Sequence, residues 1–154
     1  MRSVVRESIA APCEVVFDLV HDYERRLEWD TLLSRADLEG GATRAARGVV
    51  ATCVGRGWLA PFALSTVYVS FERGKVAAVK LVNRVPFFAT WAASIRHAPT
   101  EDNEGSTITY TVHFTARPRW LRWIIEPIMG AFFRWETRKR LAALRAFLAK
   151  SRAS

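Results

Sequence analysis

The sequence predicts an α+β fold in which an antiparallel sheet of about seven strands packs against one long C-terminal helix. Two observations carry this prediction. From about residue 32 to 117, apolar side chains recur with period two between short turn signals, which is typical of an antiparallel meander. From about residue 119 to 150, the period becomes helical. The 154 residues are expected to form one domain, 1–154, with a sizeable core.

The chain is expected to open with a strand and two short helices. Residues 3–10 alternate weakly, and Pro12 suits an early helical position, where its missing N–H costs little. The first helix has an apolar stripe at helical spacing, made by Val15, Val16, Leu19 and Val20. A second helix is predicted at about 22–29, with Asp22 as its N-cap.

Six strands are predicted to follow, at residues 33–39, 47–57, 62–73, 75–82, 87–98 and 106–117. In the fifth of these, alternation places one set of side chains on the inward face, namely Ala89, Trp91, Ala93, Ile95 and His97. In the sixth, Tyr110 and Val112 lie on the apolar face and His113 lies on the opposite, solvent-facing side. The glycines in Gly55-Arg56-Gly57 are expected to mark a bulge or bend.

The C-terminal helix is the only long apolar element available to cover the sheet. Leu141, Leu144 and Leu148 repeat on one face. Pro127 and Gly130 are expected to kink or interrupt the helix, which would lift it off the sheet and favour an internal space.

The net charge of +8 resides entirely in the C-terminal quarter of the chain. Residues 1–116 hold 13 basic and 13 acidic side chains, whereas residues 117–154 hold 10 basic and 2 acidic ones. Cations and aromatics interleave at the start of this quarter, at Arg117, Arg119, Trp120, Arg122 and Trp123. Four roles remain open for the segment: a membrane surface contact, an acidic partner such as a carrier protein, nucleic acid, or a solvated face whose Arg stems cover apolar surface. Nucleic acid is not the expected partner, because a helix packed on a sheet offers little open surface.

Other classes are disfavoured by what the chain contains. Cys13 and Cys53 lie forty residues apart without metal-ligand spacing, so neither a disulfide framework nor a metal site is expected. The first residues form no apolar signal segment, and no stretch of 18 apolar residues is free of charge. A cytoplasmic protein without a cofactor is expected, and a peripheral contact with the inner face of the membrane is an alternative.

The order of elements resembles that of the START / Bet v 1-like (SRPBCC) superfamily, in particular its polyketide cyclase/dehydrase and lipid-transport branch. The resemblance covers nearly the whole chain and rests on three stretches: Ile9 to Pro12 with Val15 to Val20, Asp22 to Asp30, and the closing helix from Glu136 to Leu148. It implies a helix-grip fold, in which a curved antiparallel sheet wraps around the C-terminal helix. It also implies an apolar cavity that holds a lipid, a polyketide or a similar compound.

Candidate site residues follow from the predicted inward faces and from the expected entrance. The ligand-binding candidates are Trp58, Phe62, Phe88, Trp91, Ile95, Tyr110, Val112, Ile128, Phe132 and Trp135. Arg84 is a candidate for an acidic head group at the entrance. His97 and Tyr110 are the catalytic candidates, since a histidine can act as an acid or base near neutral pH.

Three functional hypotheses remain, and the first is preferred. The protein binds a hydrophobic small molecule or lipid without catalysis. Alternatively, it is a cofactor-independent polyketide cyclase/aromatase or dehydratase that uses His97 or Tyr110. In the third, it is a lipid or quinone chaperone that docks on membranes through its basic C-terminal helix. The oligomeric state does not follow from the sequence.

Overall fold

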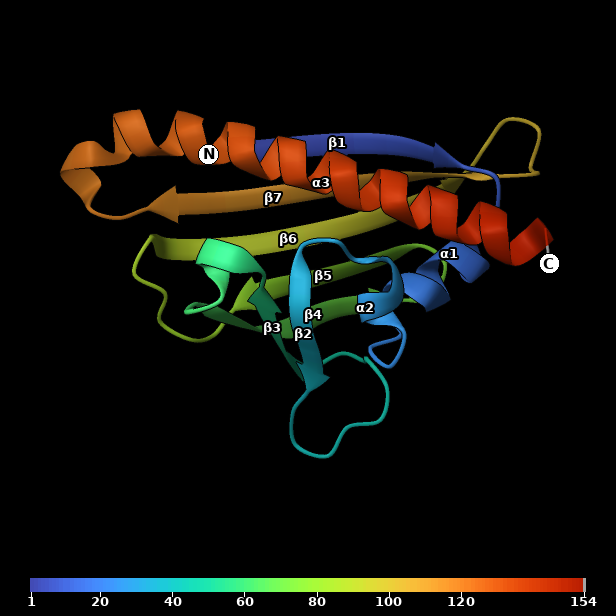
Figure 1. Ribbon diagram of the computed structural model, residues 1–154, viewed down its shortest axis with the longest axis horizontal. Helices are drawn as coiled ribbons and strands as arrows, with labels where there is room; N and C mark the ends of the chain where they lie inside the picture. The colour runs from blue at the N-terminus through green and yellow to red at the C-terminus, as the bar shows by residue number, and fades with distance from the viewer. Residues whose placement is uncertain (154) are drawn as a thin grey trace.

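The computed structural model describes residues 1–153 and confirms the predicted α+β architecture (Figure 1). The strands are β1 (Arg2–Ile9), β2 (Leu33–Leu38), β3 (Val50–Gly55), β4 (Ala63–Glu72), β5 (Val76–Leu81), β6 (Phe88–Pro99) and β7 (Ser106–Ala116). The helices are α1 (Cys13–Val20), α2 (Arg26–Trp29) and α3 (Arg122–Ala153), with short 3-10 turns η1 (Gly57–Leu59) and η2 (Arg119–Leu121). The strands form one antiparallel sheet in the order β1-β7-β6-β5-β4-β3-β2, a meander that β1 closes at its β7 edge.

One helix cannot cover a sheet of this width. Six inter-strand spacings of about 4.8 Å make a seven-stranded sheet about 29 Å across, whereas a helix with its side chains is about 10 Å in diameter. The close contacts of α3 with the sheet are made to β1 and β7. The remaining strands, from β6 to β2, lie progressively farther from α3 (Figure 1). The geometry therefore leaves part of the inner sheet face without a helix against it.

The C-terminal half of α3 forms the solid end of the protein. Leu141, Leu144 and Leu148 are buried in a core cluster with side chains of β1, α1 and β7, including Val16 and Ile108. Leu144 and Val16 are both fully buried. The predicted leucine stripe is therefore the part of α3 that anchors the helix, and any internal space must lie nearer its N-terminus.

The expectation that Pro127 and Gly130 interrupt the helix is wrong. α3 runs unbroken from Arg122 through both residues to Ala153. Pro127 lies close to the helix N-terminus, so its ring removes only a hydrogen bond to the first turn. A Cβ at Gly130 would stand 2.7 Å from Cε of Met1, so this glycine accommodates the Met1 side chain and not an internal space.

A β-bulge in β6 changes which side chains point inward. The register with β7 shifts between Phe88 and Thr90, and the extra residue allows both Phe88 and Trp91 to be buried. Ala89 is exposed, so its predicted inward placement is wrong. The second predicted helix is also shorter than expected, because residues 23–25 form a turn before α2 begins at Arg26.

Candidate functional site: a cavity beneath α3

A cavity of about 450 Å³ lies between the inner face of the sheet, η1 and the N-terminal half of α3. Its volume is in the range of sites that enclose drug-sized molecules. Eight of the predicted ligand-binding residues line it, namely Trp58, Phe62, Phe88, Trp91, Ile95, Tyr110, Val112 and Phe132. Most of them come from strands whose alternation fixed the direction of their side chains. The cavity therefore lies between α3 and the strands that the helix does not contact closely.

Two predicted residues lie outside the cavity. Ile128 and Trp135 sit on α3 and are 65% and 57% exposed. Each directly precedes a lining residue, Met129 or Glu136. One residue turns a helix by about 100°, so both side chains project from the flank of α3. Their assignment to the cavity wall is corrected accordingly.

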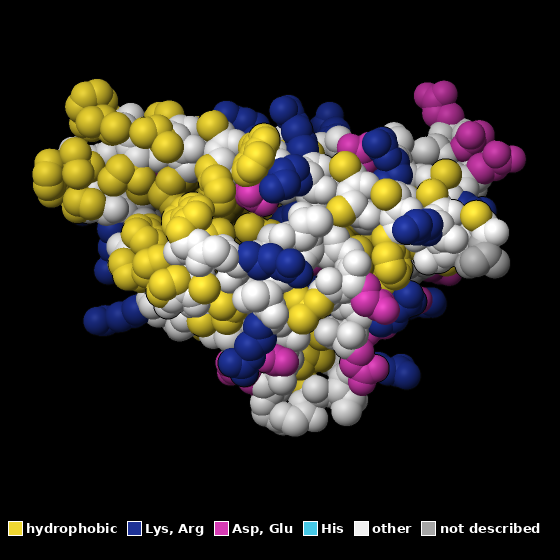
Figure 2. Space-filling view, viewed as in Figure 1, with side chains coloured by type: hydrophobic (Ala, Val, Ile, Leu, Met, Phe, Trp, Pro, Cys, Tyr) yellow, Lys and Arg dark blue, Asp and Glu magenta, His cyan; other side chains and the backbone are white. Residues whose placement is uncertain are grey.

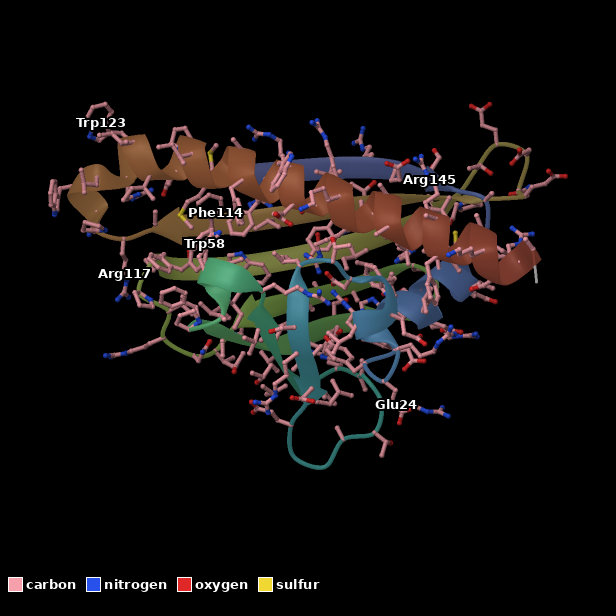
Figure 3. The ribbon with its side chains drawn as sticks, viewed as in Figure 1. Glu24, Trp58, Phe114, Arg117, Trp123 and Arg145 are labelled. Atoms are coloured by element: carbon pink, nitrogen blue, oxygen red, sulfur yellow. The ribbon has the colours of Figure 1, made fainter. Side chains whose placement is uncertain are left out.

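Two glycines allow η1 to close one side of the cavity. Gly57 has φ +62°, and a Cβ at Gly55 would stand only 2.6 Å from Cβ of Leu59. The chain can therefore bend back at the end of β3, as the glycine pattern predicts. The bend carries Trp58 against α3, where its ring lies 5.5 Å from that of Phe132 (Figure 3). Phe62, which follows η1, contacts Phe87, which directly precedes β6, with ring centroids 4.7 Å apart.

The lining of the cavity changes from apolar to polar along α3. Ile125, Met129, Phe132 and Phe133 line the part nearest the helix N-terminus, and Glu136, Thr137 and Arg140 line the other end. Ile125 and Arg140 are separated by about 22 Å along the axis, at 1.5 Å per residue. The sheet follows the same trend, from Phe88 and Trp91 at the apolar end to Tyr110 at the polar end. The cavity is therefore amphipathic along its length.

Two arginines and one aspartate form the centre of the polar end. Asp30 has a fully buried carboxylate. Arg140 donates to it from Nε at 2.9 Å and Nη2 at 2.7 Å, while Arg26 donates from Nε at 2.9 Å. Burial alone would lower the pKa of both arginines, but the carboxylate of Asp30 holds each pKa above its ordinary value, so both stay charged.

A chain of hydrogen bonds lies beside the arginines. The hydroxyl of Tyr68 is 2.9 Å from the Tyr23 hydroxyl and 2.9 Å from Nδ1 of His21. Burial raises the pKa of Tyr68 well above its ordinary value, and burial beside Arg26 lowers the pKa of His21 to about 3. All three groups are therefore neutral at pH 7. Nε2 of His21 is buried and has no hydrogen-bond partner within residues 1–153.

Sequence reasoning missed these polar residues, although a signal for Arg140 was present. Arg140 follows Thr137 by three residues and precedes Leu144 by four, so it lies on the inward stripe of the helix. A charged residue on a buried stripe needs a partner. Arg26 and Asp30 show the i, i+4 spacing of a helical ion pair, but nothing in that spacing indicates burial.

His97 does not reach the cavity. It is buried, but its ring packs against Phe17 of α1, with ring centroids 5.3 Å apart, and both ring nitrogens lack partners within the described residues. The alternation places it on the inner face correctly, yet α1 covers that end of β6. His97 therefore does not share a chamber with Tyr110, the other catalytic candidate, which lines the cavity.

We expect His97 to contribute to the loss of stability in acid. Burial lowers its pKa from 6.5 to about 4. Between these pH values the unfolded chain is protonated while the folded one is not, so this histidine removes about 3 kcal/mol from the free energy of unfolding as the pH falls from 6.5 to 4. Urea unfolding at pH 7 and pH 4.5 should show that His97→Leu loses less unfolding free energy between these pH values than wild type does. His113→Leu, on the exposed face, is the control, and equal losses in wild type and His97→Leu would refute the assignment.

A second candidate surface lies at the η2 end of α3. Large apolar side chains are exposed there, and we call this surface the tryptophan face: Trp58, Trp120, Trp123, Ile124, Ile128 and Trp135. Figure 2 shows apolar side chains gathered over this end of the molecule. Trp123 projects away from the sheet (Figure 3) and is 76% exposed. Arg117 and Arg119 are exposed at the same end of the molecule, before α3 begins, whereas Arg122 pairs with Glu126 at 3.0 Å.

Of the residues still to be placed, Arg84 and Cys13 lie outside the cavity wall, whereas Cys53 of β3 lines it. Arg84 is exposed in the loop before β6, next to the lining residue Val85. Cys13 and Cys53 are free thiols, and burial raises the pKa of Cys53. Within residues 1–153 there is no cluster of His, Cys, Asp or Glu that could hold a metal ion. No helix in that part of the chain is long and apolar enough to cross a membrane.

A curved sheet and a long closing helix with a cavity between them define the helix-grip class of START-like proteins. The chain belongs to the family described as polyketide cyclase / dehydrase and lipid transport, which it matches over residues 1–149. The comparison with curated proteins finds no match.

Solved structures of low sequence identity share the fold. Zhui aromatase/cyclase from Streptomyces sp. R1128 matches with a TM-score of 0.77 at 15% identity, covering 100% of this chain and 96% of that one. A START superfamily protein from Mycobacterium smegmatis matches with a TM-score of 0.77 at 10% identity, covering 97% of each chain. The di-domain ARO/CYC BexL of the BE-7585A biosynthetic pathway matches with a TM-score of 0.69 at 14% identity, covering 95% of this chain and 45% of that one. Identities this low establish the fold and leave the ligand open.

Proposed function

We propose that the protein binds a hydrophobic small molecule or lipid in the cavity beneath α3. The observation that carries this proposal is the cavity itself, about 450 Å³ in volume and walled mainly by aromatic and aliphatic side chains. Transfer of an apolar molecule into such a space removes its surface from water. The favourable free energy of this burial is about 25 cal/mol per Å² of apolar surface. The family's association with polyketides and lipids supports the same class of ligand.

Native mass spectrometry of gently purified protein tests this proposal. We expect a bound apolar compound that is released under denaturing conditions and lost when the cavity is filled by substitution. A protein that carries no compound and that also fails to bind added 1-decanol or decanoate would refute the proposal.

A second candidate is a cofactor-independent aromatase or cyclase. It is favoured by the proton-carrying groups at the polar end, where Tyr110 lines the cavity and Tyr68 is hydrogen-bonded to His21. Enclosure of a reactive polyketide would exclude water and restrict its folding, while these groups would move protons. Tyr68→Phe and Tyr110→Phe should then alter the cyclised product formed from a polyketide in the producing host. Unchanged product from both variants would contradict the cyclase hypothesis, and ligand binding without catalysis would remain.

A third candidate role, compatible with the first, is docking of the tryptophan face on an anionic membrane. Tryptophan favours the membrane interface, and Arg117 and Arg119 have no acidic partner among residues 1–153. We expect the protein to float with vesicles of phosphatidylcholine and phosphatidylglycerol, and Arg117→Gln/Arg119→Gln to float less. Arg145→Gln, exposed and distant in the chain, is the matched control. Equal flotation with pure phosphatidylcholine, or no effect of the double substitution, would contradict this role.

A further inference from the structure

The arginine pair at the polar end is only partly used by the protein. Arg26 donates from Nε to Asp30 and from Nη1 to the carbonyl oxygen of Val20, at 2.9 and 2.6 Å. Arg140 uses Nε and Nη2 for Asp30. Within residues 1–153, Nη2 of Arg26 and Nη1 of Arg140 have no acceptor. A guanidinium with unused N–H groups in a buried position favours an acceptor that the chain does not supply.

Both guanidiniums are held in place and line the cavity. The Arg26 side chain is only 7% exposed and stacks on Trp29, with its guanidinium carbon 5.0 Å from the ring centroid. Arg140 is 12% exposed and lies over Tyr110 at 5.6 Å. Since both belong to the cavity lining, they present donors held in place by packing and by Asp30 to whatever occupies it. Preorganised charged donors of this kind bind anions well, because little side-chain freedom remains to be lost.

The polar end of the cavity carries a net positive charge that one negative charge on a ligand would balance. Arg26 and Arg140 contribute two positive charges against the one negative charge of Asp30. Glu136 also lines the cavity, but its carboxylate is paired with Lys139 at 3.5 Å. His21, Tyr23 and Tyr68 are neutral at pH 7, because burial lowers the first pKa and raises the other two. The excess of one positive charge is balanced by a monoanion.

We propose that the cavity binds an amphiphile whose single carboxylate contacts Arg26 and Arg140, with its apolar body directed toward Ile125, Phe132 and Phe133. This inference rests on the proposed ligand-binding function and narrows it to carboxylic acids. Planar carboxylates match the fork of N–H groups on a guanidinium. The change from polar to apolar lining along α3 fixes the orientation of the ligand, because a reversed acid would bury its charge among phenyl rings.

Binding of decanoate and 1-decanol at pH 7.5, followed by isothermal titration calorimetry, tests the carboxylate site. The two probes have the same chain and differ in charge. We expect wild type to bind decanoate about tenfold more tightly than 1-decanol, which is about 1.4 kcal/mol. In Arg140→Met the ratio should fall to about one, while 1-decanol affinity changes less than about threefold. Arg145→Met is the matched control, on the same helix but exposed and paired with Glu7.

The outcomes separate this inference from the proposed function. Equal affinity of wild type for the two probes overturns the carboxylate site and leaves the apolar cavity in place. Failure to bind either probe overturns both. The wild-type comparison needs no variant, so it decides the question even if Arg140→Met folds poorly. Circular dichroism of each variant establishes that its ratio is measured on folded protein.

Discussion

Substitution of Ala93 by phenylalanine is expected to abolish binding of apolar ligands while the protein remains folded. Ala93 is buried on β6 between Trp91 and Ile95, and all three line the cavity. A phenyl ring at this position occupies space that the ligand needs. We expect affinity for 1-decanol to fall at least about a hundredfold, or about 2.7 kcal/mol. Stability should be maintained, because the ring enters existing space and does not force an already filled core apart.

The matched control for this substitution is Ala89→Phe. Ala89 lies on the same strand, but at the bulge after Phe88 it is exposed and does not line the cavity. The same added volume there should leave ligand affinity within about twofold, well under 1 kcal/mol. If Ala93→Phe binds 1-decanol as tightly as wild type, the ligand must lie elsewhere.

Removal of the Asp30 carboxylate is expected to cause the largest loss of stability. Its side chain is fully buried between the guanidiniums of Arg26 and Arg140. Asp30→Ala leaves two buried cations facing each other without a counterion, which costs about 3–5 kcal/mol of unfolding free energy. Asp18→Ala is the control, since its partner Arg73 is exposed and surface pairs contribute only about 0–1 kcal/mol. Urea unfolding at pH 7 measures both.

The same aspartate predicts a pH dependence of defined sign. Burial alone would raise the pKa of Asp30, but the two guanidiniums outweigh it and lower the pKa from 3.8 to about 2. A carboxyl whose pKa is lower in the folded state stabilises it above the unfolded pKa. About 2 kcal/mol should therefore be lost as the pH falls from about 4 to about 2. Asp30→Ala should lack this loss, and an identical acid profile in the variant would contradict the ion-pair account.

The fold and the part of the cavity wall that β6 and β7 form follow from simple periodicity. In a strand, alternation fixes the side on which a residue lies, and this rule placed Trp91, Ile95, Tyr110 and Val112 on the wall. The rule fails where a bulge intervenes, as at Ala89. Alternation also does not show which part of a strand lies under which helix. His97 is on the inner face as expected, but it packs under α1 and outside the cavity.

The helix was harder to predict than the strands. An error of one residue turns a helical side chain by about 100°, and this separates Ile128 and Trp135 from the lining residues next to them. The polar end of the cavity could not be predicted from local sequence, because it is formed by two segments that lie far apart in the chain. Arg26 lies on α2 and Asp30 is the C-cap of that helix, whereas Arg140 lies on α3, 110 residues after Asp30. Each charged residue alone is typical of a solvated surface. Their burial is explained only by the ion pairs that the fold allows them to form.

The arginines of the basic C-terminal quarter lie in two different environments. Arg140 is buried at the polar end of the cavity, whereas Arg117 and Arg119 are exposed near the tryptophan face. Net charge therefore does not describe this segment well. What each basic residue contacts depends on the side of α3 that it occupies, and the inward side lines the cavity.

A crystal structure of the protein grown with decanoate tests the central claim most directly. We expect continuous density for one ligand beneath α3, with its carboxylate within hydrogen-bond distance of Arg26 and Arg140 and its chain against Phe132 and Phe133. Density for the ligand only at the surface, or side chains collapsed into the space between α3 and the sheet, would contradict the account.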